Sequence, residues 1–183
     1  APIASLANAA RLQWMEANTS HDAQWRSESG ATPPKRVIVG DDSLSADTAY
    51  RHACEGTGIL WRGDFQNARQ LLSALIRRVD KKRRKAADSM KDAFNQHRQI
   101  QSQRARILGM LLLPVSRAHS IPLRRAPDVS RACLEAYGPA NEAYVLSLRE
   151  LQGIISAHEW RKKGVDIPAL GARIHPHYGV FSP

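Results

Sequence analysis

Residues 64–85 read DFQNARQLLSALIRRVDKKRRK, and this stretch decides the fold that the sequence predicts. Asp64 is a good N-cap residue, because its side chain can accept a hydrogen bond from the first turn of a helix. Apolar residues then recur at helical spacing along one stripe: Phe65, Ala68, Leu72, Leu75, Ile76 and Val79. No glycine or proline separates this stripe from the cations of residues 81–85. The stretch therefore predicts a long amphipathic helix with a strongly basic continuation.

The apolar spacing continues past the basic run as far as Pro114. The residues that carry it are Ala87, Met90, Phe94, His97, Ile100, Ile107, Leu108 and Leu111. We therefore expect two long helices, either continuous or hinged near residues 81–87. The spacing is too irregular for the sustained heptads of a coiled coil.

Shorter elements complete the predicted fold. Further helices are expected at residues 3–15, 45–55, 127–138 and 147–163, on the basis of apolar spacing and end signals such as the capping box of Ser147 and Glu150. A short extended piece is expected at residues 37–39 and a turn or short extended piece at residues 58–63. A loop is expected at residues 18–35 and a loop or short strand at residues 116–125. The fold class is thus mainly α, a multi-helix bundle with two long helices and minor extended segments.

The positive charge of the chain is concentrated in one segment. The formal net charge is +10, and residues 77–106 hold eleven Lys or Arg against three Asp. A field concentrated in this way attracts polyanions and steers their approach. The predicted nucleic-acid-binding residues are Arg77, Arg78, Lys81, Lys82, Arg83, Arg84, Lys85 and Lys91, with Arg124 and Arg125 as a weaker second group.

A second interpretation of the basic run stays open. Five consecutive cations at residues 81–85 cover all sides of a helix, so they could form a solvated helix or hinge that binds nothing. Only Phe94 is an aromatic residue close to these cations in the sequence, which argues against a stacking platform for single strands. The contact that we expect is therefore with phosphates and carries little sequence information.

No sequence motif for catalysis or metal binding is recognisable in this chain. Residues 56–58 read GTG, which is too short for a phosphate-binding loop and leads into no helix. Residues 158–160 read HEW and lack the second histidine of a zinc helix, and no Cys/His group at ligand spacing accompanies His175 and His177. We therefore expect no catalytic residue and no metal ligand within the chain.

The composition of the chain also predicts its cellular compartment. The two cysteines, Cys54 and Cys133, are too few for a disulfide framework and suggest reduced thiols. No run approaches the ~20 apolar residues of a membrane span, and no secretion signal is recognisable. We therefore expect a cytoplasmic protein with no membrane partner.

The C-terminal residues differ in character from the rest. Residues 165–183 are apolar, aromatic and interrupted by prolines, which predicts an extended segment. We expect residues 1–164 to form a helical domain and residues 165–183 to be a linker that leads into a further domain absent from this chain.

One family resembles this tail. Residues 171–183, GARIHPHYGVFSP, resemble the segment ahead of the cofactor-binding domain in certain bacterial class I S-adenosylmethionine-dependent methyltransferases of the small-domain type, which carry a similar YGVF-x-P sequence. Residues 59–70 and 157–164 also resemble the N-terminal region of such proteins. The resemblance implies an α/β, Rossmann-like methyltransferase domain after Pro183, with S-adenosylmethionine as the cofactor of the full-length protein.

The resemblance implies few site residues in this chain. Tyr178, Gly179 and Phe181 match the family's lead-in and are implied to flank the cofactor pocket. The family's glycine-rich loop and its Asn-Pro-Pro-Tyr-like motif are both missing, so no catalytic residue is implied and this chain alone is expected to bind no cofactor.

The predicted function is an N-terminal substrate-recognition domain of an S-adenosylmethionine-dependent methyltransferase that acts on RNA or another nucleic acid. Its predicted partners are the nucleic acid and its own catalytic domain. An alternative is a free-standing helical module that binds nucleic acid or the ribosome without enzymatic activity. A third possibility is a scaffold whose long helices contact other proteins while the basic run is only solvated.

Overall fold

The computed structural model describes residues 10–88, 93–167 and 172–174, and their side chains over residues 10–82 and 97–164. Its fold is mixed α/β with a six-stranded, nearly closed sheet, so the expectation of a mainly α bundle is wrong. The strands are β1 (Arg11–Glu16), β2 (Thr19–Trp25), β3 (Arg36–Gly40), β4 (Thr57–Trp61), β5 (Leu111–Val115), β6 (Tyr144–Ser147), β7 (Val165–Ile167) and β8 (Ala172–Ile174). The helices are α1 (Ala46–Cys54), α2 (Phe65–Asp88), α3 (Ala93–Leu108), α4 (Ser130–Tyr137) and α5 (Leu148–Lys163).

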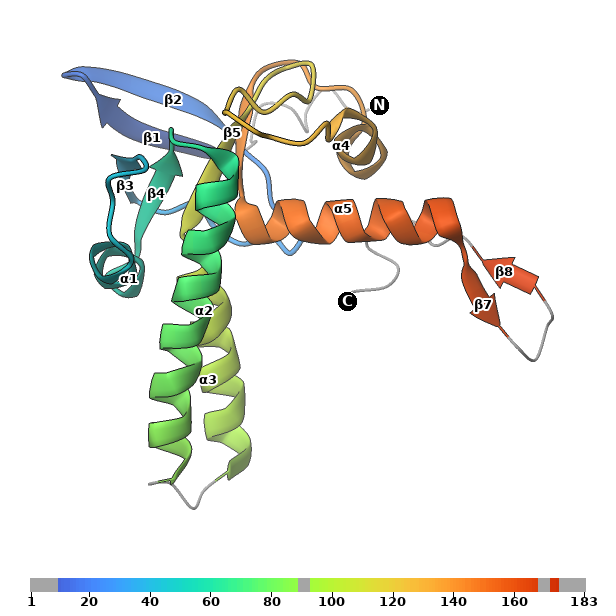
Figure 1. Ribbon diagram of the computed structural model, residues 1–183. Helices are drawn as coiled ribbons and strands as arrows, with labels where there is room; N and C mark the ends of the chain where they lie inside the picture. The colour runs from blue at the N-terminus through green and yellow to red at the C-terminus, as the bar shows by residue number, and fades with distance from the viewer. Residues whose placement is uncertain (1–9, 89–92, 168–171, 175–183) are drawn as a thin grey trace.

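The six strands of the main sheet follow the order β1-β2-β6-β5-β4-β3. Strands β3, β4 and β5 are parallel; α1 connects the first two and the α2–α3 hairpin connects the second pair. Strand β6 is antiparallel to β5 and parallel to β2, and β1 and β2 form an antiparallel hairpin. The edge strands β1 and β3 contact one another, which nearly closes the sheet. Strands β7 and β8 pair separately beyond the end of α5 (Figure 1).

The β1–β2 hairpin replaces the part of the helix expected at residues 3–15 that the structure describes, and part of the loop expected at residues 18–35. In β1, Leu12 is buried and Trp14 and Glu16 are partly buried, whereas Gln13 and Met15 are exposed, so this segment follows a period of two. The turn residues Ala17 and Asn18 both have positive φ angles, 50° and 62°, as a two-residue hairpin turn of type I′ requires. An Ala-Asn pair is a weak turn signal compared with Asn-Gly, which explains why the sequence did not reveal the hairpin.

Strand β5 replaces the end of the second predicted long helix. Leu111, Leu112 and Leu113 are all fully buried, because β5 lies between β4 and β6 and both of its faces are covered. A short apolar run of this kind does not distinguish a buried strand from a buried helix. Pro114 argues against an inner strand, but the pairing of β5 with β4 ends at Leu112, so the proline is paired on the β6 side, opposite Val145.

The two faces of the main sheet pack into different cores. All six strands contribute to the inner side of the curved sheet: its core holds Leu12, Ala23, Trp25, Leu60, Leu112 and Val145, with Trp14 and Val37 packed against them. The outer side packs against the helices, where Phe65, Leu72 and Leu75 of α2 meet Leu151 and Ile154 of α5. The predicted apolar stripe of α2 is therefore buried, in a core that it shares with strands of the sheet and with α5.

Four helices, α1, α2, α4 and α5, lie where the sequence predicted helices. Ser45 caps α1 by accepting a hydrogen bond from the backbone N–H of Thr48, and Asp64 accepts one from the N–H of Gln66 at the start of α2. Helix α4 lies between Pro127 and Gly138, and α5 begins after Ser147. The division of the chain at residue 164 stays a prediction.

Candidate nucleic-acid interface

Most of the excess positive charge lies on one projecting element. Helices α2 and α3 run side by side away from the sheet as an antiparallel hairpin (Figure 1). In α2, Val79 is the last described side chain that belongs to the buried core; in α3, the core residues are Ile107 and Leu108 at its end. We call residues 77–88 of α2 and 93–106 of α3 the arm. Most of the arm's cations therefore lie beyond the packed body of the protein.

Two of the arm's arginines form ion pairs where the arm joins the body of the protein, which we call the root of the arm. Arg78 donates from Nε and Nη2 to Asp47 Oδ1 of α1 at 3.1 and 2.8 Å. Arg104 of α3 donates from Nε to Asp80 Oδ1 of α2 at 2.9 Å. These contacts tie the arm to α1 and its two helices to one another. Arg78, which the sequence placed among the binding residues, is thus engaged by an acid within the protein.

Other predicted cations of the arm face solvent. Arg77, Lys81 and Lys82 are exposed, and no ion pair or hydrogen bond engages their side chains within the described part of the chain. Arg98 and Arg106 of α3 are exposed in the same way. Charges of this kind are available to phosphates without first breaking an internal contact.

For several predicted residues the structure describes either the backbone alone or nothing. The structure describes the backbone of Arg83, Arg84 and Lys85 as part of α2, but not their side chains. Lys91 lies between the described parts of α2 and α3, and the implied cofactor-flanking residues Tyr178, Gly179 and Phe181 lie beyond residue 174.

Arg124 and Arg125 do not join the arm. Arg125 donates from Nε to Asp64 Oδ2 at 2.6 Å, beside the first residue of α2, and the backbone oxygen of Arg124 accepts from the N–H of Phe65 at 2.9 Å. Seventeen residues of helix separate Asp64 from Lys81, which corresponds to about 25 Å. The two predicted cationic groups therefore lie at opposite ends of α2.

The pair of Arg125 and Asp64 has a structural role. The hydrogen bond from Arg125 lowers the pKa of Asp64 below its ordinary value. Asp64 itself is buried, and its backbone N–H donates to Asp42 Oδ1 at 2.9 Å. Asp42 also accepts from Asn67 Nδ2 at 2.9 Å. These contacts join the loops that follow β3 and β4 to the start of α2, so we assign no ligand to them.

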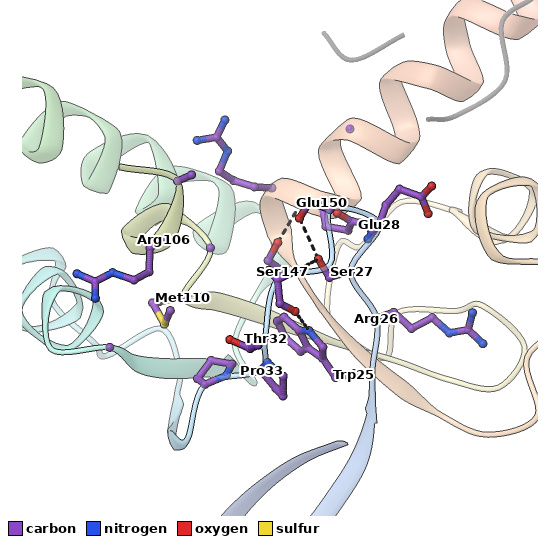
Figure 2. A pocket seen from close by; sticks show the side chains of 18 of the residues that line it. Trp25, Arg26, Ser27, Glu28, Thr32, Pro33, Arg106, Met110, Ser147 and Glu150 are labelled. Carbon is purple, nitrogen blue, oxygen red and sulfur yellow. Dashed lines mark hydrogen bonds between the residues drawn. The ribbon is translucent and has the colours of Figure 1, made fainter. Parts of the chain in front are cut away.

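A large cleft beside the root of the arm has no counterpart in the sequence predictions. Its volume is about 1310 Å³, and it lies where β3, β4 and β5 begin and where β2 and β6 end. Its charged lining residues are Arg26, Lys35, Arg36, Arg106 and Arg149, with Glu28, Glu55 and Glu150. Figure 2 shows Arg106 and Met110 at the end of α3, and Ser147 and Glu150 at the start of α5. These segments are distant in sequence, which is why no single motif revealed the cleft.

Glu150 connects segments of one wall of this cleft through hydrogen bonds. The capping box predicted for α5 is half formed: the N–H of Glu150 donates to Ser147 Oγ at 3.0 Å, but the carboxylate turns away from the helix cap. Instead, Glu150 Oε1 accepts from the backbone N–H of Glu28 at 2.9 Å and from Tyr137 Oη at 2.7 Å. The Arg26 guanidinium lies 5.0 Å from the centre of the Tyr137 ring, within the range of a cation–π contact. The negative charge of Glu150 is therefore already engaged by donors of the protein.

No protein-family model, curated protein or solved structure matches this chain. Over residues 10–88, 93–167 and 172–174, no three His, Cys, Asp or Glu side chains gather in a way that could hold a metal ion. None of the helices described there combines the length and the apolar character needed to cross a membrane.

Proposed function

We propose that this chain is the substrate-recognition part of an S-adenosylmethionine-dependent methyltransferase and that it binds RNA or another nucleic acid through the arm. The observation that carries the binding half of the proposal is the placement of charge. A segment with eleven cations and three acids forms a projecting helical hairpin, and Arg77, Lys81 and Lys82 are exposed on it. A surface of this kind suits the phosphate backbone, because phosphate contacts need clustered cations and no base-reading geometry.

The arm's construction supports this role. The ion pairs of Arg78 and Arg104 join it to the body and to itself, while the cations further along carry no internal acid partner within the described side chains. The protein thus separates arginines that hold the arm from cations that remain available.

The methyltransferase half of the proposal rests on the resemblance of residues 59–70, 157–164 and 171–183 to the N-terminal region of that family. In the full-length protein a separate domain would bind S-adenosylmethionine and transfer the methyl group. Calorimetric titration of the full-length gene product with S-adenosylmethionine tests this half, and the absence of binding would contradict it.

The binding half is tested by the salt dependence of affinity. We expect this chain to bind a fluorescein-labelled 20-nucleotide single-stranded RNA, with log K falling linearly as log salt rises. The slope should be about −0.7 for each phosphate contacted, so three to six contacts correspond to roughly −2 to −4. Fluorescence anisotropy between 50 and 300 mM NaCl measures it. Binding that does not change with salt, or no binding at 50 mM, would contradict a phosphate-contacting arm.

A further inference from the structure

One stripe of α3 leads from the arm into the cleft. Arg98, Ser102 and Arg106 are spaced four residues apart, so they lie on the same face of the helix. Ser102 and Arg106 line the cleft, and Arg98 lies one turn further along the arm. Both arginines are exposed, and they are about 12 Å apart along the helix axis. This face of α3 therefore carries positive charge from the arm to the cleft.

Arg149 brings a further positive charge to the cleft from α5. It is exposed, and no ion pair or hydrogen bond engages its side chain within the described part of the chain. The residue is accessible to solvent, but neighbouring atoms partly desolvate its guanidinium; this desolvation, followed by the nearby charge of Arg104, lowers the pKa of Arg149, with Asp80 acting in the opposite direction. An arginine remains protonated under such conditions. The positive field at the root of the arm thus extends across to the start of α5.

The rest of the lining is partly apolar. Trp25, Pro33, Pro34 and Met110 contribute to the wall, and Trp25 Nε1 donates to the oxygen of Ala31 at 2.7 Å, which anchors the linker that carries the prolines. Figure 2 shows Pro33 and Thr32 near Trp25 and Met110. A single strand exposes apolar base faces beside its phosphates, whereas a duplex hides most of them. The combination of cations and an apolar wall therefore favours a single strand.

The size of the cleft points to a polymer. Its volume of about 1310 Å³ exceeds the range of roughly 300–1,000 Å³ typical of pockets for drug-sized ligands. The lining holds five cations and three acids, so its balance of charge is positive. An acidic or neutral small molecule would fill only part of this space.

We propose that the cleft between α3 and α5 holds a single-stranded segment of the nucleic acid that the arm binds. In this arrangement Arg98, Arg106 and Arg149 contact phosphates, and Pro33 and Met110 contact bases. The proposal rests on the proposed function, because it assigns to the same ligand a second point of contact. It adds a preference for single strands, which the arm alone does not provide.

The test compares the double variant R106Q/R149Q with the control R117Q/R131Q. All four arginines are exposed, and the control removes the same charge from positions outside the cleft. We expect the cleft variant to bind a 20-nucleotide single-stranded RNA roughly twentyfold more weakly at 0.1 M salt, because two phosphate contacts are lost. For the same reason, the slope of log K against log salt should be smaller in magnitude by about 1.4. Affinity for a blunt duplex of the same length should change less than about twofold relative to the control.

The outcomes separate the two proposals. Equal effects of the cleft and control variants on single-stranded RNA would overturn the cleft proposal, and so would an equal loss of affinity for duplex and single strand. If the unaltered chain bound neither RNA, the proposed function itself would be overturned. Cross-linking of RNA that contains 4-thiouridine gives a second readout. We expect adducts within residues 31–36 and 102–110. Adducts confined to other segments would contradict the cleft proposal.

Discussion

Replacing Arg77, Lys81 and Lys82 together by glutamine is expected to weaken the binding of a single-stranded RNA roughly a hundredfold at 0.1 M salt. The three side chains are exposed on the arm and have no internal partner among the described residues, so each is free to contact a phosphate. Losing three contacts should also flatten the slope of log K against log salt by about two. Because glutamine favours helices nearly as well as lysine and arginine, α2 should remain intact. Fluorescence anisotropy gives the affinities, and circular dichroism checks the helix content.

The matched control removes three cations from elsewhere on the surface. Arg117, Arg131 and Lys162 are exposed and lie in the β5–α4 loop, in α4 and in α5. Their combined change to glutamine lowers the net charge of the chain by the same amount, so it reproduces any effect of overall charge on affinity. If both triple variants lost affinity equally, general attraction would explain the binding and the arm would have no specific role.

The second large effect concerns the sheet. Leu112→Ala should lower the free energy of unfolding by about 3–5 kcal/mol, the usual cost of removing a buried leucine side chain and leaving a cavity. Leu112 is fully buried on the inner side of the sheet, in the same core as Leu12, Leu60 and Val145. A densely packed core of this kind collapses only partly into the gap. Urea denaturation followed by tryptophan fluorescence measures the change.

Leu134→Ala provides the comparison for that experiment. Leu134 lies on α4 and is 49% exposed, so its truncation should change the free energy of unfolding by less than about 1 kcal/mol. The same chemical change at the two positions separates burial in the sheet from residue type. Similar shifts for both variants would mean that β5 does not lie at the centre of the fold.

Helices α2 and α5 were predictable because each combined a periodic apolar stripe with an end signal. Asp64 and the stripe of residues 65–79 identified α2, and Ser45 and Ser147 identified the starts of α1 and α5. Extended segments were expected near β3 and β4, but the sheet as a whole was missed because its other strands have weak local signals. The β1–β2 hairpin turns at Ala17 and Asn18 without a glycine, and short apolar runs such as β5 are compatible with either structure.

The candidate site was predictable only where charge is contiguous in the sequence. The basic run of residues 77–85 could be recognised from composition, and the structure adds that Arg78 is engaged by Asp47. The separation of Arg125 from the arm could not be foreseen, because it depends on the length and direction of α2. The cleft brings together residues from β2, α3 and α5, and only the tertiary fold places them around one space.

The most direct test of the account is the chemical reactivity of lysines in the presence and absence of RNA. Acetylation followed by mass spectrometry reports each amine separately, and a lysine whose ammonium contacts a phosphate should react more slowly. With saturating single-stranded RNA we expect Lys81 and Lys82 of the arm to be protected, while the exposed Lys162 on α5 keeps its reactivity. Unchanged reactivity of Lys81 and Lys82 under saturation, or protection confined to Lys162, would contradict an arm that binds nucleic acid.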